Sequence, residues 1–139
     1  MYQTCTEFGY FQTSDYPKEA FAEYLTLDFF VQQCIDIFGP QFDKQEIEEA
    51  VNKVNKNYGG TNISFTTMSN VVFPNGLVDP WHKLGVLKPQ FNKPTIIPIV
   101  TPGTAHCADM VDSSNDDPPA LKKARVQISN AIGQFLNSD

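Results

Sequence analysis

Two short apolar runs in the second half of the chain constrain its fold most strongly. Residues 71–73 are Val, Val and Phe and end at a Pro-Asn-Gly turn, and residues 96–100 form a second run that contains Pro98. We predict a short buried strand for the first run and an edge strand for the second, because proline lacks the amide donor that an inner strand needs. Each run is followed by a polar loop that carries one titratable side chain, Asp79 or His106.

The first half of the chain has the spacing of helices instead. Apolar residues recur at the intervals of one helix face over residues 27–38, with Thr26 as a predicted N-cap. Cys34 falls on that face and is expected to point inward. A second helix is predicted at about 44–58, with Asp43 at its start in a capping-box-like position.

The apolar pattern is irregular at the N-terminal end of the chain and regular at the C-terminal end. Residues 1–25 hold many aromatic side chains without a clean period, which indicates an irregular segment that is extended at its start. The closing helix is predicted from about 119 to 137, with Asp117 as its cap and Pro118-Pro119 opening it. A boundary near residue 60 separates a helical part from an α/β part.

Composition excludes several classes of protein. The 139 residues form one domain or part of one, and 41% of them are hydrophobic. A net charge of −6 argues against nucleic acid or an anionic membrane surface as a partner. No apolar run approaches the roughly 20 residues that a membrane helix needs. The first ten residues lack the basic and apolar regions of a signal peptide.

The three cysteines are Cys5, Cys34 and Cys107, and none has CxxC spacing. A zinc ribbon or a thioredoxin-like site is therefore not indicated. One disulfide with one free thiol and three reduced thiols are both compatible with the composition. Asn62-Ile63-Ser64 is the one N-glycosylation sequon, and it lies in a Gly-rich polar stretch where a glycan fits.

Asp79 is the first candidate for chemistry. It precedes Pro80, which biases its backbone toward an extended conformation and is expected to hold the carboxylate at a loop tip, away from any helix. Taken alone, an Asp-Pro pair is more often a turn residue than a catalytic acid. The alternative is an acid that orients and stabilises a catalytic imidazolium.

His106 is the second candidate. It follows Pro102-Gly103 and the small residues Thr104 and Ala105, which leave its imidazole accessible. Taken alone, such a histidine is more often a surface or capping residue. An acid and then a histidine after successive strands is, however, the order of the last two members of an α/β-hydrolase triad.

Two rival uses of these side chains are weaker. A zinc site would draw on His82, His106, Cys107 and Asp79. That spacing matches no established pattern, and adjacent residues rarely both ligate one ion well, so no metal is predicted. A Cys–His hydrolase would need Cys5 or Cys34 as nucleophile, but Cys34 faces a helix interior, where a thiol is inert, and Cys5 lies on no recognisable nucleophile turn.

Four stretches, in this order, carry a family resemblance: YQTCTEFGYF at 2–11, YGG at 58–60, NVVFPNGLVDPWHKLGV at 70–86 and GTAHCADM at 103–110. With them the chain resembles the C-terminal part of the serine peptidase family that includes lysosomal Pro-X carboxypeptidase, the lysosomal type of dipeptidyl peptidase and thymus-specific serine protease. Its Asp-Pro-Trp-His and His-Cys-Ala-Asp-Met motifs are most similar to the thymus-specific branch.

The resemblance implies the fold class α/β, as the C-terminal portion of an α/β-hydrolase with the end of its inserted helical cap domain. On this mapping residues 1–58 finish the cap domain and residues 59–139 are the hydrolase portion with the acid and histidine loops. Asp79 matches the family's catalytic acid and His106 its catalytic base. The resemblance implies no cofactor.

The resemblance also implies a pairing of cysteines. Cys5 and Cys34 match two residues that the family joins as a disulfide, and Cys107 has a counterpart in the relatives most similar at this loop. A disulfide that closes this loop contributes about 3–4 kcal/mol by the loop-entropy estimate. It also implies a lysosomal or secreted setting, in which Asn62 is a candidate glycosylation site.

One departure from the family limits the expected activity. None of the serines lies in a Gly-x-Ser-x-Gly turn, so this chain contains no predicted nucleophile. We expect a serine-type carboxypeptidase or dipeptidyl peptidase that cleaves peptides next to proline, with the nucleophile, the oxyanion hole and a signal peptide supplied by an upstream part. The chain alone is expected to be catalytically silent. The alternative is an inactive fragment that acts as a binding or decoy protein.

Overall fold

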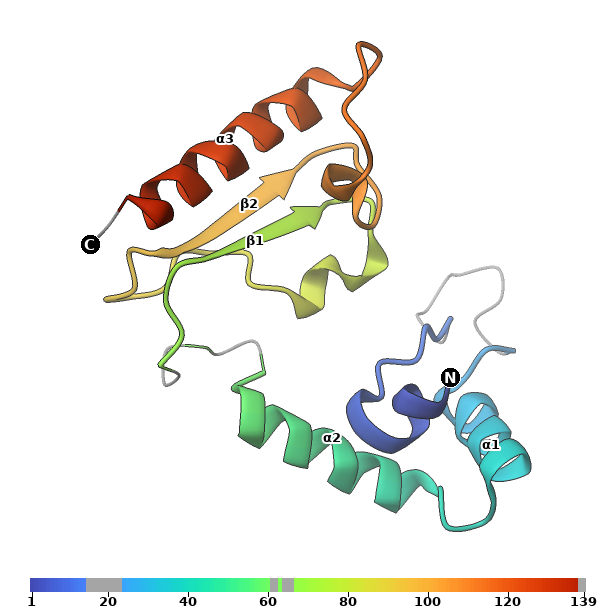
Figure 1. The fold of residues 1–139 in the computed structure, drawn as a ribbon. Helices are drawn as coiled ribbons and strands as arrows, with labels where there is room; N and C mark the ends of the chain where they lie inside the picture. Colours follow the sequence, from blue (N-terminus) through green and yellow to red (C-terminus); the bar gives the residue numbers. More distant parts are fainter. Residues whose placement is uncertain (15–23, 61–62, 64–66, 138–139) are drawn as a thin grey trace. The chain divides into compact units, whose positions relative to one another are not determined.

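The computed structural model describes residues 1–14, 24–60, 63 and 67–137. These fall into two compact units, Met1–Tyr58 and Gly59–Asp139. Figure 1 shows helices throughout the first unit, and a helix beside two strands in the second. Each unit is described by itself.

The two predicted helices of the first unit are present as α1 (Leu27–Phe38) and α2 (Lys44–Tyr58). Both begin with the predicted caps. Thr26 Oγ1 accepts a hydrogen bond from the Phe29 N–H at 3.2 Å. Asp43 Oδ1 accepts one from the Glu46 N–H at 3.0 Å. These bonds satisfy amides that have no partner within the first helical turn.

The prediction of an extended start was wrong. Thr4–Phe8 form the short π-helical turn η1, which the Gly9 N–H closes by donating to the Thr4 carbonyl at 3.0 Å. Gly9 has a φ of 62°, and a Cβ at this position would lie 2.8 Å from Val51 Cγ2. The turn depends on this glycine and on contact with α2, neither of which a periodic pattern reveals.

Cys5 and Cys34 form a disulfide at the centre of the first unit, with an S–S distance of 2.08 Å. Both residues are fully buried, as predicted for Cys34. The bridge joins η1 to α1 across 29 residues, a loop for which the entropy estimate is about 3–4 kcal/mol. The surrounding core is Val31 and Ile47, with Phe11, Ile35, Phe38, Phe42 and Val51 packed against it.

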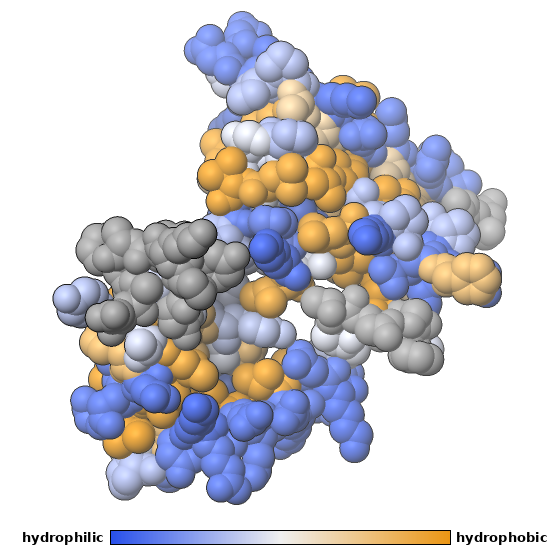
Figure 2. All heavy atoms as spheres, turned by 180° about the vertical axis from the view of Figure 1, so that it is seen from behind, coloured by the Kyte–Doolittle hydropathy of each residue, from blue (hydrophilic) through white to orange (hydrophobic). Residues whose placement is uncertain are grey.

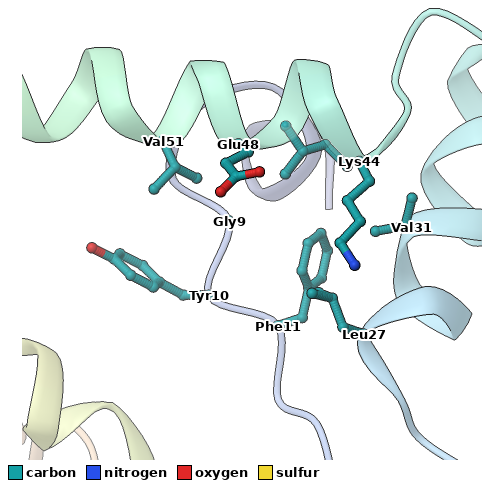
Figure 3. Close-up of a pocket in the computed structure, with 9 residues that line it drawn as sticks. Gly9, Tyr10, Phe11, Leu27, Val31, Lys44, Glu48 and Val51 are labelled. Carbon is teal, nitrogen blue, oxygen red and sulfur yellow. The ribbon is translucent and has the colours of Figure 1, made fainter.

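A small cavity of about 230 Å³ opens beside this core and is lined entirely by residues of the first unit. Figure 3 shows Phe11, Leu27 and Val31 on its apolar side, with Lys44 and Glu48 on α2. Its lining residues include neither Asp79 nor His106.

The second unit contains two parallel strands, β1 (Val71–Gly76) and β2 (Ile96–Thr101). Their register pairs Val71 with Ile96 and Gly76 with Thr101. The prediction that the first strand ends at a Pro-Asn-Gly turn was wrong, because the strand continues through all three residues. All three residues pair with β2, and the Asn75 amide also donates to the Val86 carbonyl at 3.2 Å.

The helix α3 (Pro119–Leu136) packs along β2 and β1, as Figure 1 shows. Its N-cap is Pro118, so the predicted cap at Asp117 was wrong. The Asp117 carboxylate instead accepts a hydrogen bond from the Ser114 N–H at 3.1 Å and lies near Arg125. The buried residues of α3 are Leu121, Ala124 and Ala131.

Helices combined with a parallel strand pair place the described structure in the α/β class. Ile63, Val86 and Ile96 form a buried cluster in the second unit, with Val71 and Phe73 against it. Figure 2 shows that hydrophobic side chains also lie on the surface. Among the described helices, none combines the length and apolar character required to cross a bilayer.

Candidate active site

Parallel pairing brings the carboxyl ends of β1 and β2 to the same edge, and the two candidate loops leave from that edge. Backbone hydrogen bonds then join the loops. The Leu77 N–H donates to the Thr101 carbonyl at 3.1 Å, and the Val78 N–H donates to the Thr104 carbonyl at 3.0 Å. The loop that carries Asp79 is therefore fixed against the loop that carries His106.

Gly76 and Thr104 make this close approach possible. Thr104 is expected from the sequence only as a small neighbour of His106, and Gly76 only as part of a turn. A Cβ on Gly76 would lie 2.5 Å from the carbonyl oxygens of Thr104 and Ala105. Thr104 is buried, and its hydroxyl donates to the Thr101 carbonyl at 3.0 Å. The available signal is a glycine just before the loop that carries Asp79, which the sequence alone favours as part of a turn.

Asp79 has the extended backbone that Pro80 predicts, with φ −69° and ψ 119°. It does not stand away from a helix as expected, because it is the N-cap of the 3₁₀ helix η3 (Pro80–Leu84). Its Oδ1 accepts a hydrogen bond from the Trp81 N–H at 2.9 Å. Asp79 is only 7% exposed, so this carboxylate is buried.

The second carboxylate oxygen of Asp79 meets the imidazole of His106. Asp79 Oδ2 and His106 Nδ1 are 2.6 Å apart. A carboxylate accepts only, so Nδ1 carries a proton and donates it to Asp79. In the neutral form of the ring, Nε2 then has the free lone pair. The His106 side chain is 68% exposed, which leaves that nitrogen accessible. This is the geometry of the acid and histidine in a Ser-His-Asp triad.

The environment of Asp79 acts on its pKa in opposite directions. Burial raises the pKa and is the largest single effect. The hydrogen bonds from His106 and from the Trp81 N–H, with the charges of His106 and His82, together outweigh it. The pKa of Asp79 is therefore lowered from the ordinary value of 3.8, and the carboxylate is ionised at neutral pH.

The four side chains of the alternative zinc site do not gather around one point. His82 Nδ1 contacts the backbone carbonyl of Asp79 and not its carboxylate. Cys107 is exposed, has a φ of 55° and precedes the short 3₁₀ turn η4 (Ala108–Met110). Within the ranges that the structure covers, no three His, Cys, Asp or Glu side chains gather as a metal ion would require.

The alternative of a Cys–His hydrolase built on Cys5 or Cys34 was wrong, because the two sulfurs are bonded to each other. Among the described residues, the hydrogen bond of the His106 ring is the one to Asp79. The predicted glycosylation site Asn62 lies outside the described residues.

Sequence comparisons extend the geometric result. A protein of Caenorhabditis elegans is 36% identical over 143 residues, a match to 100% of this chain and 27% of that protein. Thymus-specific serine protease of Mus musculus is 33% identical over 98% of this chain and 25% of its own length. Lysosomal Pro-X carboxypeptidase of Bos taurus is 36% identical over 58% of this chain and 15% of its length.

The chain thus spans about a quarter of the length of the first two of these relatives. The family described as Serine carboxypeptidase S28 matches residues 1–128, which include both candidate loops and the disulfide. That match covers most of the chain, and the relatives agree with it. The chain therefore belongs to the serine carboxypeptidase S28 family, a family of serine peptidases.

Proposed function

We propose that this chain supplies the acid and the base of a serine-type exopeptidase, with Asp79 as the acid and His106 as the base. The observation that carries the proposal is the 2.6 Å contact between Asp79 Oδ2 and His106 Nδ1. The buried carboxylate can orient and stabilise the imidazole through their hydrogen bond, and the exposed imidazole can transfer the proton. Acyl transfer requires both of these roles. Family membership supports a peptidase as the host of this pair.

In the proposed reaction, Nε2 of His106 takes the proton of a serine hydroxyl as that oxygen attacks the peptide carbonyl. The imidazolium that forms is stabilised by Asp79, which stays ionised and keeps the ring in one tautomer. His106 then gives the proton to the leaving amine, and water repeats the cycle to release the acyl group. The serine and the oxyanion donors are proposed to come from a part of the enzyme outside this chain.

We propose peptides as substrates, with cleavage next to proline. We also propose that residues 59–139 are the C-terminal portion of an α/β-hydrolase fold and that residues 1–58 are the end of its inserted helical cap domain. Support for the proline preference comes from the name of the bovine relative, Pro-X carboxypeptidase. A lysosomal or secreted location is proposed because the chain carries a disulfide, which persists in oxidising compartments.

Labelling by a fluorophosphonate probe tests whether the nucleophile lies in this chain or in a part outside it. The purified 139-residue chain is expected to remain unlabelled, because acid and base without nucleophile and oxyanion hole lack the main catalytic terms. A longer polypeptide that carries an in-frame Gly-x-Ser-x-Gly upstream of Met1 is expected to be labelled. The matched controls are His106→Gln in the longer polypeptide and heat denaturation of each sample.

Two outcomes would contradict the proposal. Labelling of the 139-residue chain that disappears in His106→Gln would show a nucleophile within this chain. Coding sequence with a genuine start at Met1 and no upstream serine motif would favour the binding or decoy alternative over an enzyme.

A further inference from the structure

Arg125 is the single arginine of the chain and lies on α3, with only 21% of its side chain exposed. Its guanidinium donates two hydrogen bonds to neighbouring backbone carbonyls. Nη1 donates to the Asp109 carbonyl at 2.6 Å, and Nη2 donates to the Ala108 carbonyl at 3.1 Å. One side chain on the helix thus holds two successive peptide groups of another segment.

Those two carbonyls belong to η4, which begins two residues after His106. A turn of three residues leaves most of its carbonyls without a partner inside the turn. The planar fork of arginine can bond both at once, whereas a lysine ammonium offers a single point of charge. Arg125 therefore fixes the backbone on the C-terminal side of His106.

Asp117 holds the guanidinium from the other side. Its Oδ2 lies 3.3 Å from Arg125 Nε, an ion pair that falls short of an aligned hydrogen bond. The same oxygen accepts from the Ser114 N–H at 3.1 Å, and the Asp117 side chain is only 14% exposed. The arginine is thus oriented by a carboxylate that the preceding loop itself positions.

The His106 side chain is mostly exposed, so its own packing cannot set its position. Its backbone is anchored on the N-terminal side by the Val78 N–H on the Thr104 carbonyl. On the C-terminal side Cys107 takes a φ of 55°, a conformation that a residue with a Cβ seldom adopts unless its surroundings impose it. The arginine contacts begin one residue later.

We propose that Arg125 is a positioning residue for the candidate active site, which holds the loop after His106 so that Nδ1 meets the Asp79 carboxylate. This inference rests on the proposed function for its catalytic meaning. The positional claim concerns a hydrogen bond within this chain, so it can be tested without any hydrolysis.

The test uses carboxyl-carbon NMR titration of Asp79 in the 139-residue chain. The matched control is Lys122→Gln, since Lys122 also lies on α3 and donates to a loop carbonyl, that of Asn115 at 2.6 Å. In Arg125→Gln we expect the pKa of Asp79 to rise from its lowered position, because the His106 hydrogen bond that lowers it is lost. Arg125→Lys should give an intermediate value, and Lys122→Gln should match the wild type.

Unchanged Asp79 titration in a folded Arg125→Gln variant would overturn the inference, as would an equal change in Lys122→Gln. Far-UV circular dichroism establishes whether each variant retains its helices. If Arg125→Gln does not fold, Arg125→Lys is the test variant. An Asp79 titration like that of the wild type in Arg125→Lys would show that the guanidinium is dispensable and would overturn the inference.

Kinetics in a longer, active polypeptide separate this inference from the proposed function. Arg125→Gln should lower kcat about 10²-fold with little change in KM, the size expected from a misplaced catalytic group. An Asp79 titration that depends on Arg125 in an enzyme insensitive to His106→Gln would leave the positional claim intact and reject the proposed function.

Discussion

At the residue scale, Asp79 holds three neighbours at once. Its two carboxylate oxygens accept from the Trp81 N–H and from His106, and its backbone carbonyl contacts the ring of His82. The turn role and the pairing with histidine, which looked like alternatives in the sequence, are compatible because they use different atoms. The short helix η3 thereby orients the carboxylate toward His106.

The lowered pKa of Asp79 predicts a pH dependence of stability. A carboxylate with a depressed pKa in the folded state contributes stability above its unfolded pKa, and that contribution is lost as the pH falls through the folded value. Asp79→Asn should therefore destabilise the second unit at neutral pH, and its difference from the wild type should shrink on acidification below the ordinary value of 3.8. Urea denaturation followed by the fluorescence of Trp81, the only tryptophan, measures this difference.

Asp112→Asn is the matched control for this titration, because Asp112 is an exposed aspartate. It should leave the free energy of unfolding within about 0.5 kcal/mol of the wild type at every pH. A constant difference between Asp79→Asn and the wild type from neutral to strongly acidic pH would contradict the account.

What the sequence could predict at this scale was the identity and order of Asp79 and His106. The neighbouring sequence is sufficient for this, because each residue follows a predicted strand. The roles of Gly76 and Arg125, and the hydroxyl contact of Thr104, could not be found in the same way. Their importance comes from contacts between loops or between a helix and a loop, which depend on how the chain closes in space.

At the scale of elements, α1 and α2 were predictable because periodicity, cap residues and a glycine stop all lie within the same short stretch. The failures share a different cause. The turn η1 contacts α2 and is joined to α1 by the disulfide. The last three residues of β1 pair with β2, and Asp117 faces Arg125 instead of capping α3. In each case a distant partner determined the local structure.

Two glycine substitutions should have opposite effects on stability. Gly9→Ala meets a φ of 62° and a Val51 methyl 2.8 Å from the new Cβ, so it should destabilise the first unit by more than about 1 kcal/mol. Gly133→Ala lies in the interior of α3 with no atom within 4 Å of the new Cβ, so it should stabilise the second unit by up to about 1 kcal/mol.

Urea denaturation followed by far-UV circular dichroism and by Trp81 fluorescence separates these effects. Gly9→Ala should act on the helical signal, and Gly133→Ala should move the fluorescence transition to higher urea. Equal and same-signed shifts for the two variants would contradict the strain that we expect from an alanine at position 9.

At the scale of the whole molecule, the family match covers residues of both units. The match runs from the disulfide-linked helical unit through the acid and histidine loops into α3. The chain nevertheless spans only about a quarter of the relatives that match it over nearly its full length. The α/β class could be predicted from the pattern of strands and helices, whereas the pairing of the cysteines required the family resemblance, because three cysteines permit several arrangements.

The central claim is that Asp79 and His106 act as acid and base in a serine peptidase. The most direct test is the rate of peptide hydrolysis by the longest polypeptide that carries this chain in frame, compared across His106→Gln, Asp79→Asn and the control Cys107→Ser. We predict that Asp79→Asn lowers kcat about 10⁴-fold and His106→Gln at least as much, while Cys107→Ser stays within about threefold. Activity in His106→Gln within about tenfold of the wild type would contradict the claim.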